Sequence, residues 1–442
     1  MKYKVGIVSL GCAKNQVDAE MLLAKLNKSK FEIVEDVAMS DAAIVNTCAF
    51  IDPAKQESIE EILELAKLKA EGKIKCLIVT GCLAERYKED VMKQLPEVDA
   101  CIGIGANDKI AEIISHALSG NKQELFPPKE ELSLEGDRIQ STPRHYAYLK
   151  IAEGCDNHCT YCAIPMIRGR YRSRTIESLV KEAKWLSDGG VKELILIAQD
   201  TSYYGTDIYE KPMLPKLLKE LCKIEKLKWI RVLYCYPERI TNELIDTIAT
   251  EDKIVKYLDL PLQHCNKDVL KVMNRKGDLE SLTKLIQRLR ERIPNITLRS
   301  TFITGFPGET EEQFEELAKF VEDIKFQRMG CFPYSQEENT PAAKLPNQID
   351  EDIKKKRAEI ITERQQLIME EYAESLIDSE VEVVVEGFDR YAECYFGRSA
   401  GDCPEVDGNI FFTANSIKPT EGSFVRVKIT DCLGIDPVGE MI

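Results

Sequence analysis

The chain has 442 residues, of which 44% are hydrophobic and 31% are charged, and its formal net charge at neutral pH is −15. This apolar content excludes a mainly disordered chain, and no run of about 18 uncharged apolar residues exists to span a membrane. The length corresponds to about three domains of ordinary size. The first residues lead directly into a strand-like segment without a signal peptide, which predicts a cytoplasmic protein.

The first region, residues 1–118, alternates short apolar runs with segments that have apolar residues at helical spacing. Repeated strand–helix units of this kind predict an open parallel sheet with crossover helices. The predicted strands are Val5–Leu10, Ala43–Val45 and Cys76–Thr80, and the predicted helices are Val17–Leu26, Glu57–Ala70 and Glu85–Leu95. Residues 119–144 contain two adjacent prolines and a polar, acidic run, so they predict a linker.

Strand–helix units resume in residues 145–374 and predict a full or partial parallel barrel, with active residues at the carboxyl ends of its strands. The predicted strands are Leu194–Ala198, Trp229–Tyr234, Tyr257–Leu260, Leu298–Ile303 and Gly330–Tyr334, and the predicted helices are Ile176–Ser187, Leu214–Leu221, Leu279–Arg292, Glu311–Ile324 and Asp350–Ile377. Residues 375–442 hold alternating and β-branched segments separated by Gly and Pro, which predict a small antiparallel β-barrel. The whole chain is therefore predicted to be an α/β protein.

Fifteen cysteines in a chain without an export signal indicate metal or cluster ligation wherever they follow a spacing pattern. Cys155, Cys159 and Cys162 form a C-x3-C-x2-C run. Three thiolates in one loop can each take one iron of a cubane cluster, which leaves the fourth iron open for an exchangeable ligand. The alternative is a zinc site completed by His158, although adjacent ligands in a single loop make a poor tetrahedron.

A second set of cysteines follows the three predicted strands of the first region. Cys12, Cys48 and Cys82 are separated by 36 and 34 residues, about one strand–helix–strand unit each. In an open parallel sheet the carboxyl ends of the strands lie on one edge, so the three sulfurs could converge on a second cluster with one open iron. The alternative is three small buried core cysteines. The other nine cysteines show no such pattern and are predicted to be structural.

Further candidates lie at or near predicted strand ends. Gly305 and Gly308 belong to a glycine-rich turn that would let a ligand approach the backbone closely. Gln199, Arg299 and His264 are predicted to lie near a cofactor or substrate, with a hydrogen-bonded core histidine as the alternative for His264.

A basic run follows the first cysteine loop. Arg168, Arg170, Arg172 and Arg174 fall within seven residues. Such a run can bind phosphate or clamp carboxylates, so Arg168, Arg170 and Arg174 are predicted to bind substrate. The alternative is a solvated loop that balances nearby acids.

The C-x3-C-x2-C run resembles the signature of radical S-adenosylmethionine (SAM) enzymes. This resemblance implies that the open iron binds the amino and carboxylate groups of SAM and that one electron then cleaves SAM to a 5′-deoxyadenosyl radical. It also implies that Tyr161 lies beside the adenine, with simple packing of the loop as the alternative, and that the turn with Gly305 and Gly308 contacts the adenosine.

Both cysteine sets, followed by a small β-barrel, resemble the layout of radical-SAM methylthiotransferases over nearly the whole chain. These enzymes have an N-terminal cluster domain, a radical-SAM domain and a C-terminal TRAM domain. Residues 11–18, 199–205, 333–337 and 402–408 resemble the RimO branch, which modifies an aspartate of a small-subunit ribosomal protein. The transfer-RNA branch more typically has Gln-Met-Asn after the first cysteine, which is absent here.

This resemblance implies two [4Fe-4S] clusters, one SAM as methyl donor and one SAM as radical source, which together insert a methylthio group at the aspartate β-carbon. It also implies an electron donor such as flavodoxin or ferredoxin. The nearest alternative is the same chemistry on an adenosine of transfer RNA. An iron–sulfur carrier without radical chemistry and a zinc-stapled binding module are the alternatives from other classes.

The charge of the C-terminal region favours a protein substrate. Residues 375–442 contain 13 acidic and 5 basic side chains, a net charge of −8. RNA-binding surfaces need basic residues to neutralise phosphates, whereas an acidic surface attracts a basic partner such as a ribosomal protein. The sequence therefore predicts that transfer RNA is not the substrate.

Overall fold

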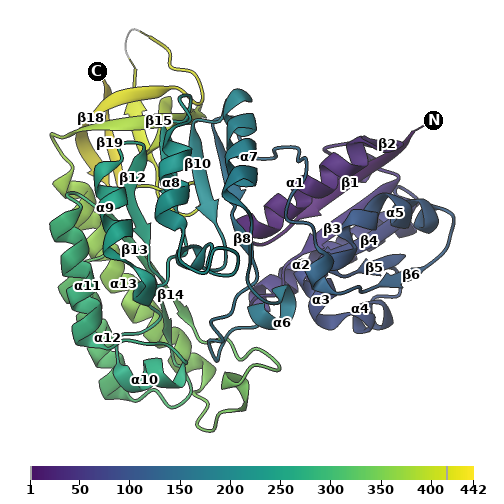
Figure 1. The fold of residues 1–442 in the computed structure, drawn as a ribbon, viewed down its shortest axis with the longest axis horizontal. Coiled ribbons are helices and arrows are strands. Elements are labelled where there is room, and N and C mark those ends of the chain that lie inside the picture. Colours follow the sequence, from purple (N-terminus) through teal and green to yellow (C-terminus); the bar gives the residue numbers. More distant parts are fainter. Residues whose placement is uncertain (1, 415–416) are drawn as a thin grey trace.

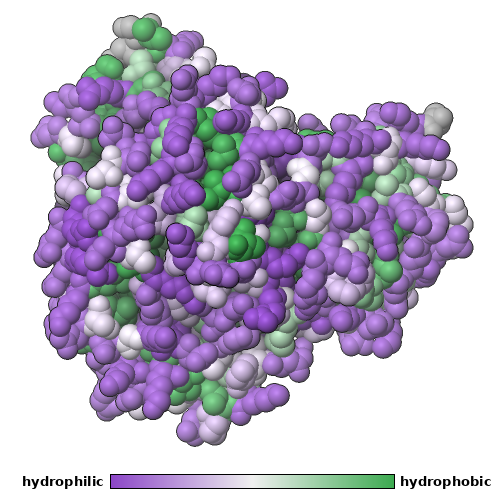
Figure 2. Space-filling model, in the orientation of Figure 1, coloured by the Kyte–Doolittle hydropathy of each residue, from purple (hydrophilic) through white to green (hydrophobic). Residues whose placement is uncertain are grey.

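The structure, a computed structural model, describes residues 2–414 and 417–442. Figure 1 shows an N-terminal α/β lobe beside a larger central α/β part, with a small β-barrel at the C-terminal end packed on the central part. Among the residues described, no helix is both long and apolar enough to cross a membrane. Most of the molecular face drawn in Figure 2 is hydrophilic.

The N-terminal lobe is a six-stranded parallel sheet with the strand order β2-β1-β3-β4-β5-β6. Helices cover both faces, and the central strand β3 is buried on both sides because its residues alternate between two apolar cores. The strands are β1 Tyr3–Ser9, β2 Phe31–Ile33, β3 Ala42–Thr47, β4 Cys76–Gly81, β5 Ala100–Ile102 and β6 Gln123–Leu125. The helices are α1 Ala13–Asn27, α2 Asp52–Ala70, α3 Cys82–Tyr87, α4 Glu89–Gln94 and α5 Ile110–Leu118.

Several features of this lobe differ from the sequence prediction, which did not include β2, β5, β6 or α5. β6 lies inside the predicted linker of residues 119–144 and pairs with β5, so the first sheet continues to Leu125. The single helix predicted over Glu85–Leu95 is two short helices, because the backbone at Lys88 has a φ of 47° and interrupts the α-helical conformation.

The central part is an open, six-stranded parallel sheet with the order β7-β10-β11-β12-β13-β14, so the predicted barrel is a partial one. Helices pack on its outer face and form the largest apolar core. The strands are β7 Tyr146–Lys150, β8 Ala152–Glu153, β9 Arg172–Ser173, β10 Glu193–Ile197, β11 Trp229–Val232, β12 Ile254–Asp259, β13 Thr297–Thr304 and β14 Arg328–Pro333. The helices are α6 Ile164–Arg168, α7 Ile176–Asp188, α8 Leu214–Cys222, α9 Asn242–Thr250, α10 Lys267–Val272, α11 Leu279–Arg292, α12 Glu311–Ile324 and α13 Glu351–Ser375.

The C-terminal region is a closed five-stranded barrel with the order β15-β16-β17-β19-β18. Its pairings are antiparallel except for β17 with β19, which run parallel. The strands are β15 Glu380–Asp389, β16 Cys394–Ser399, β17 Ile410–Thr413, β18 Phe424–Leu433 and β19 Asp436–Met441.

One loop of the small barrel, residues 400–408, docks on the inner face of the central sheet. The Arg231 guanidinium donates to the Ala400 carbonyl over 2.9 Å, and the Tyr257 hydroxyl donates to Asp407 over 2.8 Å. Acidic side chains of the barrel pair with Lys and Arg of the central part, among them Glu382 with Lys228, Asp402 with Arg328 and Asp407 with Arg299. Part of the acidic charge that the sequence assigned to a partner therefore holds the barrel in place.

Candidate active site

Three cysteines follow three neighbouring strands of the N-terminal sheet. Cys12 follows β1 and precedes α1, Cys48 follows β3, and Cys82 follows β4 and begins α3. Because β1, β3 and β4 are adjacent and parallel, their carboxyl ends meet at one edge of the sheet. The structure thus brings the three cysteines to the same edge.

Two glycines allow the chain to pass closely between these cysteines. Gly11 has a φ of 88°, and a Cβ atom on it would stand 2.7 Å from the Cys48 Sγ. Gly81 has a φ of 93°, and a Cβ atom there would stand 2.5 Å from the Thr47 carbonyl oxygen. A side chain at either position would force the cysteine loops apart, so glycine is required directly before Cys12 and Cys82.

The electrostatic surroundings of these thiols differ from one another. Burial raises the pKa of the Cys82 thiol to about 12 and also raises the pKa of Cys48. Cys12 is an exposed residue; desolvation by the surrounding groups acts in the same direction, but the Lys14 and Arg168 cations outweigh it and lower the pKa of the thiol. Arg168 favours the thiolate at all three positions, and the thiolate is the form that ligates metal.

Arg168 lies buried at the seam between the N-terminal lobe and the central part. Its guanidinium donates to the Cys82 Sγ over 3.2 Å and to the Asn15 Oδ1 over 3.0 Å. It also forms ion pairs with Asp18 and Glu153. The sequence predicted that Arg168 binds substrate; the structure corrects this expectation, because the side chain is 2% exposed and its partners are protein groups.

Glu153, two residues before Cys155, is a buried carboxylate at the same seam. Lys150 pairs with it at 2.8 Å and also with Asp18 of the N-terminal lobe. Burial alone would raise the pKa of Glu153, but Lys150 and Arg168 outweigh it and lower this pKa to about 2. Gln199, beyond the end of β10, donates to the Glu153 Oε1 over 2.8 Å, and its own Oε1 is buried without a partner among the described residues. An orphaned acceptor here fits an absent ligand that donates a hydrogen bond.

The three cysteines of the second set lie in the loop between β8 and β9, which pair with each other and close the loop. The Cys155 amide donates to the Gly169 carbonyl over 3.1 Å, and the Cys162 Sγ accepts from the Ile164 amide at 3.4 Å. Burial raises the pKa of Cys155 to about 11 and also raises that of Cys162, and the neighbouring Cys159 contributes to both shifts. As thiolates these crowded groups would repel one another, so a ligated cation would compensate their charges.

Tyr236 contacts this second set directly. Its hydroxyl lies 3.1 Å from the Cys159 Sγ, and the Arg275 guanidinium lies 3.9 Å from its ring centroid. Tyr161 is partly buried in the same group; burial, assisted by Cys159, raises its pKa well above 10. Sequence reasoning missed Tyr236 because no spacing pattern marks it, although it lies just beyond the carboxyl end of β11, where active residues of such sheets gather.

A three-residue segment links the two cysteine sets. Tyr236 touches Cys159, and two residues earlier the ring of Tyr234 lies 3.5 Å from the Nζ of Lys14, which is two residues after Cys12. The seam therefore places both cysteine loops around the carboxyl end of β11.

Three more candidates follow strands at the carboxyl edge of the sheet: Gly305, Gly308 and His264. Side chains of the protein lie next to Gly305 and His264. A Cβ atom on Gly305 would stand 2.3 Å from the Lys354 Cγ, so its closest neighbour is α13, whereas a Cβ on Gly308 would meet open space. His264 is fully buried, with its Nε2 3.5 Å from the Glu309 carboxylate and its Nδ1 accepting from a backbone amide. The structure therefore places His264 as the hydrogen-bonded core histidine.

Of three other predicted side chains, Arg299 and Arg174 lie apart from the cysteines, whereas Arg170 pairs with Asp156 of the cysteine loop at 3.5 Å. Arg299 is near the amino end of β13, where it pairs with Asp259 at 3.2 Å and with Asp407 at 3.7 Å, so it serves barrel docking. Arg174 is buried against Glu182 at 2.7 Å. These placements correct the expected ligand roles of Arg299 and Arg174. Arg170 is 87% exposed and remains accessible to a partner.

The donor chemistry of both cysteine sets fits a cubane cluster. Among the described residues, no group of three or more His, Cys, Asp or Glu side chains is arranged around one ion. A cubane spreads its protein ligands over separate irons, so the thiolates need not meet at a point. The cysteine-only donor sets, the close approach at Gly11 and the cation on the Cys82 sulfur agree with such a group.

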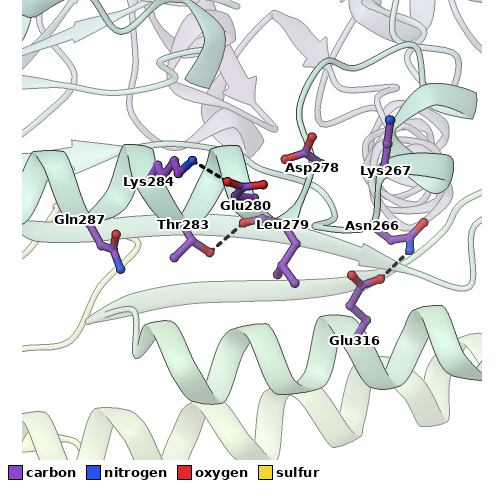
Figure 3. A pocket seen from close by; sticks show the side chains of 9 residues that line it. All are labelled: Asn266, Lys267, Asp278, Leu279, Glu280, Thr283, Lys284, Gln287 and Glu316. Carbon is purple, nitrogen blue, oxygen red and sulfur yellow. Dashed lines mark hydrogen bonds and ion pairs between the residues drawn. The ribbon is translucent and has the colours of Figure 1, made fainter.

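A shallow hollow of about 600 Å³ lies on the outer helical face, away from both cysteine sets. Figure 3 shows polar side chains of α11 and the neighbouring segments around it, including an Asn266–Glu316 hydrogen bond and a Lys284–Glu280 pair. It contains neither a cysteine nor a residue of the seam, so we do not assign the active site to it.

Comparison with family profiles divides the chain into three matches. The Radical SAM superfamily matches residues 149–321, Uncharacterized protein family UPF0004 matches residues 4–103, and the TRAM domain matches residues 377–442. In structure, the chain is similar to the radical S-adenosylmethionine methyltransferase TsrM from Kitasatospora setae, solved with cobalamin and a [4Fe-4S] cluster bound. The TM-score is 0.58 at 15% identity, over 77% of each chain, which supports the fold.

Curated relatives match the whole chain at high identity. The protein named ribosomal protein uS12 methylthiotransferase RimO from Lachnoclostridium phytofermentans is 49% identical over 437 residues, which cover 99% of each chain. The protein of the same name from Clostridium botulinum strain Eklund 17B is 49% identical over 441 residues, 99% of this chain and 98% of the relative. With these matches and its two cysteine sets, the chain belongs to the RimO family of radical-SAM methylthiotransferases.

Proposed function

We propose that this protein inserts a methylthio group at the β-carbon of an aspartate in the small-subunit ribosomal protein uS12. The relatives carry uS12 in their names, and the chain matches them from end to end. The observation that carries the proposal is the seam, where Arg168 reaches Cys82 of one set while Tyr236 reaches Cys159 of the other. A substrate carbon bound between the two loops would be close to both candidate cluster sites, and methylthiolation needs both.

Two [4Fe-4S] clusters and SAM are the cofactors of this family. We propose that Cys12, Cys48 and Cys82 hold one cluster and that Cys155, Cys159 and Cys162 hold the other. When bound, these groups supply a carbon-centred radical, a methyl group and a site for sulfur.

Residues of the protein fix the positions of the two cluster sites relative to each other. Arg168 and Glu153 fix the seam, Tyr236 fixes Cys159, and Gln199 offers its unpaired Oε1 beside the C-x3-C-x2-C loop. Tyr161 and the turn at Gly305 and Gly308 remain proposed contacts of SAM, and the exposed Arg170 remains a proposed contact of the substrate.

The substrate class follows from charge. The small barrel keeps an acidic surface after its docking pairs are formed, because most of its acidic side chains pair with no base of the central part. Such a surface attracts a basic ribosomal protein and repels RNA. We further propose that the protein works in the cytoplasm and receives electrons from a flavodoxin or ferredoxin.

Mass spectrometry of uS12 from cells with and without this gene tests the proposal. One aspartate should carry a methylthio group when the gene is present and should be unmodified when the gene is deleted. Restoring the gene with Cys12, Cys48 and Cys82 changed to Ser should leave uS12 unmodified. Unchanged uS12 together with a lost methylthioadenosine in transfer RNA would overturn the proposed substrate.

A further inference from the structure

Lys14 is a buried cation that stabilises the Cys12 thiolate but has no carboxylate partner among the described residues. Its side chain is 9% exposed, and its Nζ packs 3.5 Å from the centroid of the Tyr234 ring. In residues 2–414 and 417–442, no carboxylate lies within ion-pair distance of this nitrogen. The other two buried lysines differ, because Lys150 pairs with Asp18 and Glu153, and Lys354 pairs with Glu351.

Burying a charged ammonium is costly unless an anion or a set of acceptors compensates it. The face of one tyrosine compensates only in part. Asp259 also interacts with Lys14 through charge, but its carboxylate is already paired with Arg299 at 3.2 Å and accepts the Tyr234 amide at 3.0 Å. The Cys12 thiol interacts with Lys14 through charge, but no carboxylate of the described residues pairs with this ammonium, so the site can accept the carboxylate of a ligand.

The position of Lys14 is fixed by its neighbours. Asn15, the next residue, donates to the carbonyls of Leu10 and Thr47 and accepts from Arg168. Tyr234 on the other side has a φ of 59°, in the left-handed region that bulky residues rarely adopt. A strained backbone that aims an aromatic ring at an unpaired cation is typical of a binding site.

Lys14 also lies where the reacting group must be. It is two residues from Cys12, and the ring it contacts is two residues from Tyr236, whose hydroxyl touches Cys159. The ammonium is thus next to the segment that joins the two cysteine sets.

We propose that Lys14 binds the side-chain carboxylate of the acceptor aspartate and so selects a carboxylate-bearing substrate. The inference rests on the proposed function and deepens it, because it names the substrate group that the seam recognises. A substrate carboxylate supplies a negative charge that can pair with the Lys14 ammonium. This pairing would hold the adjacent β-carbon between the two cysteine loops. The carboxylate of SAM is the other source of the same chemistry, and the experiment below separates the two.

The test uses the anaerobically reconstituted enzyme with SAM and two fluorescent uS12 peptides, one with the acceptor aspartate and one with asparagine in its place. Asparagine keeps the shape of the side chain and removes its charge. The wild-type enzyme should bind the aspartate peptide more tightly. Lys14→Met, which keeps the length of the side chain, should weaken binding of the aspartate peptide about tenfold to hundredfold and leave the asparagine peptide unchanged.

Two variants serve as controls. Lys14→Arg keeps the charge and should keep the preference for aspartate. Lys25→Met removes a lysine from the same helix, where it pairs with Asp108 on the surface, and should also keep the preference. The Lys14→Met apoprotein should melt close to wild type, because no ion pair with a carboxylate is lost; a clearly lower melting temperature would make Lys14 a structural residue and overturn the proposal.

An unchanged preference for aspartate in Lys14→Met would also overturn it. Weaker SAM binding by that variant, with the peptide preference intact, would assign the anion to SAM instead. Failure of the proposed function looks different, because the wild-type enzyme would then leave the aspartate peptide unmodified.

Discussion

The Arg168 guanidinium and the Cys82 sulfur come from different parts of the fold and lie 3.2 Å apart. Arg168 ends the short helix α6 that follows one cysteine set, and Cys82 belongs to the other set. One side chain therefore connects the two candidate cluster sites. A cation that donates to a cluster sulfur stabilises the more negative, reduced state of the cluster.

Replacing Arg168 with Gln should make the cluster of the N-terminal lobe harder to reduce. The measurement is a redox titration followed by electron paramagnetic resonance, in protein whose Cys155, Cys159 and Cys162 are Ser so that one cluster remains. Arg174→Gln is the matched control, because Arg174 is also buried and paired with an acid but touches no cysteine. An equal shift in both variants would refute a specific role of Arg168.

The stability of the seam should fall as the solution becomes acidic. The pKa of Glu153 is about 2 in the folded protein, against an ordinary value of 4.5, so its ion pairs stabilise the fold fully above pH 4.5. This contribution should be lost as the pH falls from about 4.5 toward 2. Glu153→Gln should cost about 3–5 kcal/mol at pH 7, because it leaves Lys150 and Arg168 short of an anion.

Urea unfolding of wild type and Glu153→Gln at several pH values checks this prediction. The free energies of unfolding should converge as the pH approaches 2. A difference that stays constant between pH 7 and pH 3 would show that Glu153 acts through its shape and not through its charge.

The small barrel should separate from the central sheet when Glu193 is neutralised. Its carboxylate bridges Arg231 of β11 at 2.7 Å and Arg398 of β16 at 2.8 Å, and all three side chains are buried. Glu193→Gln should destabilise this docking by about 3–5 kcal/mol and expose the chain after α13 to limited proteolysis. Glu220→Gln, which removes an exposed surface pair, is the control and should leave the digestion pattern unchanged.

Local sequence signals predicted five helices of the central part closely, namely α7, α8, α11, α12 and α13, but not α6, α9 or α10. The ranges predicted for α11 and α12 coincide with the structure, because each helix begins at a capping box, Asp278 with Ser281 and Thr310 with Gln313. The short edge strands β2 and β6 were missed, since three residues are too few to show a period.

Long-range pairing explains where the site predictions went wrong. Arg168 stands in a basic run that suggests an exposed surface, yet Asp18, 150 residues earlier, takes its charge. Arg299 and Asp407 are likewise far apart in the sequence. The role of Lys14 was not predicted from the sequence, because the carboxylate that we propose it binds belongs to a ligand and not to this chain. Charge pairing between distant segments has no local pattern, so the sequence predicted the two cysteine sets as candidate sites but not the residues that connect them.

The central claim is that two independent three-cysteine sites each hold a [4Fe-4S] cluster, and counting iron and sulfide in reconstituted protein tests it most directly. Wild type should contain about eight irons per chain, and changing either cysteine triplet to Ser should leave about four. A Cys12, Cys48 and Cys82 variant that keeps the full wild-type iron content would contradict the account.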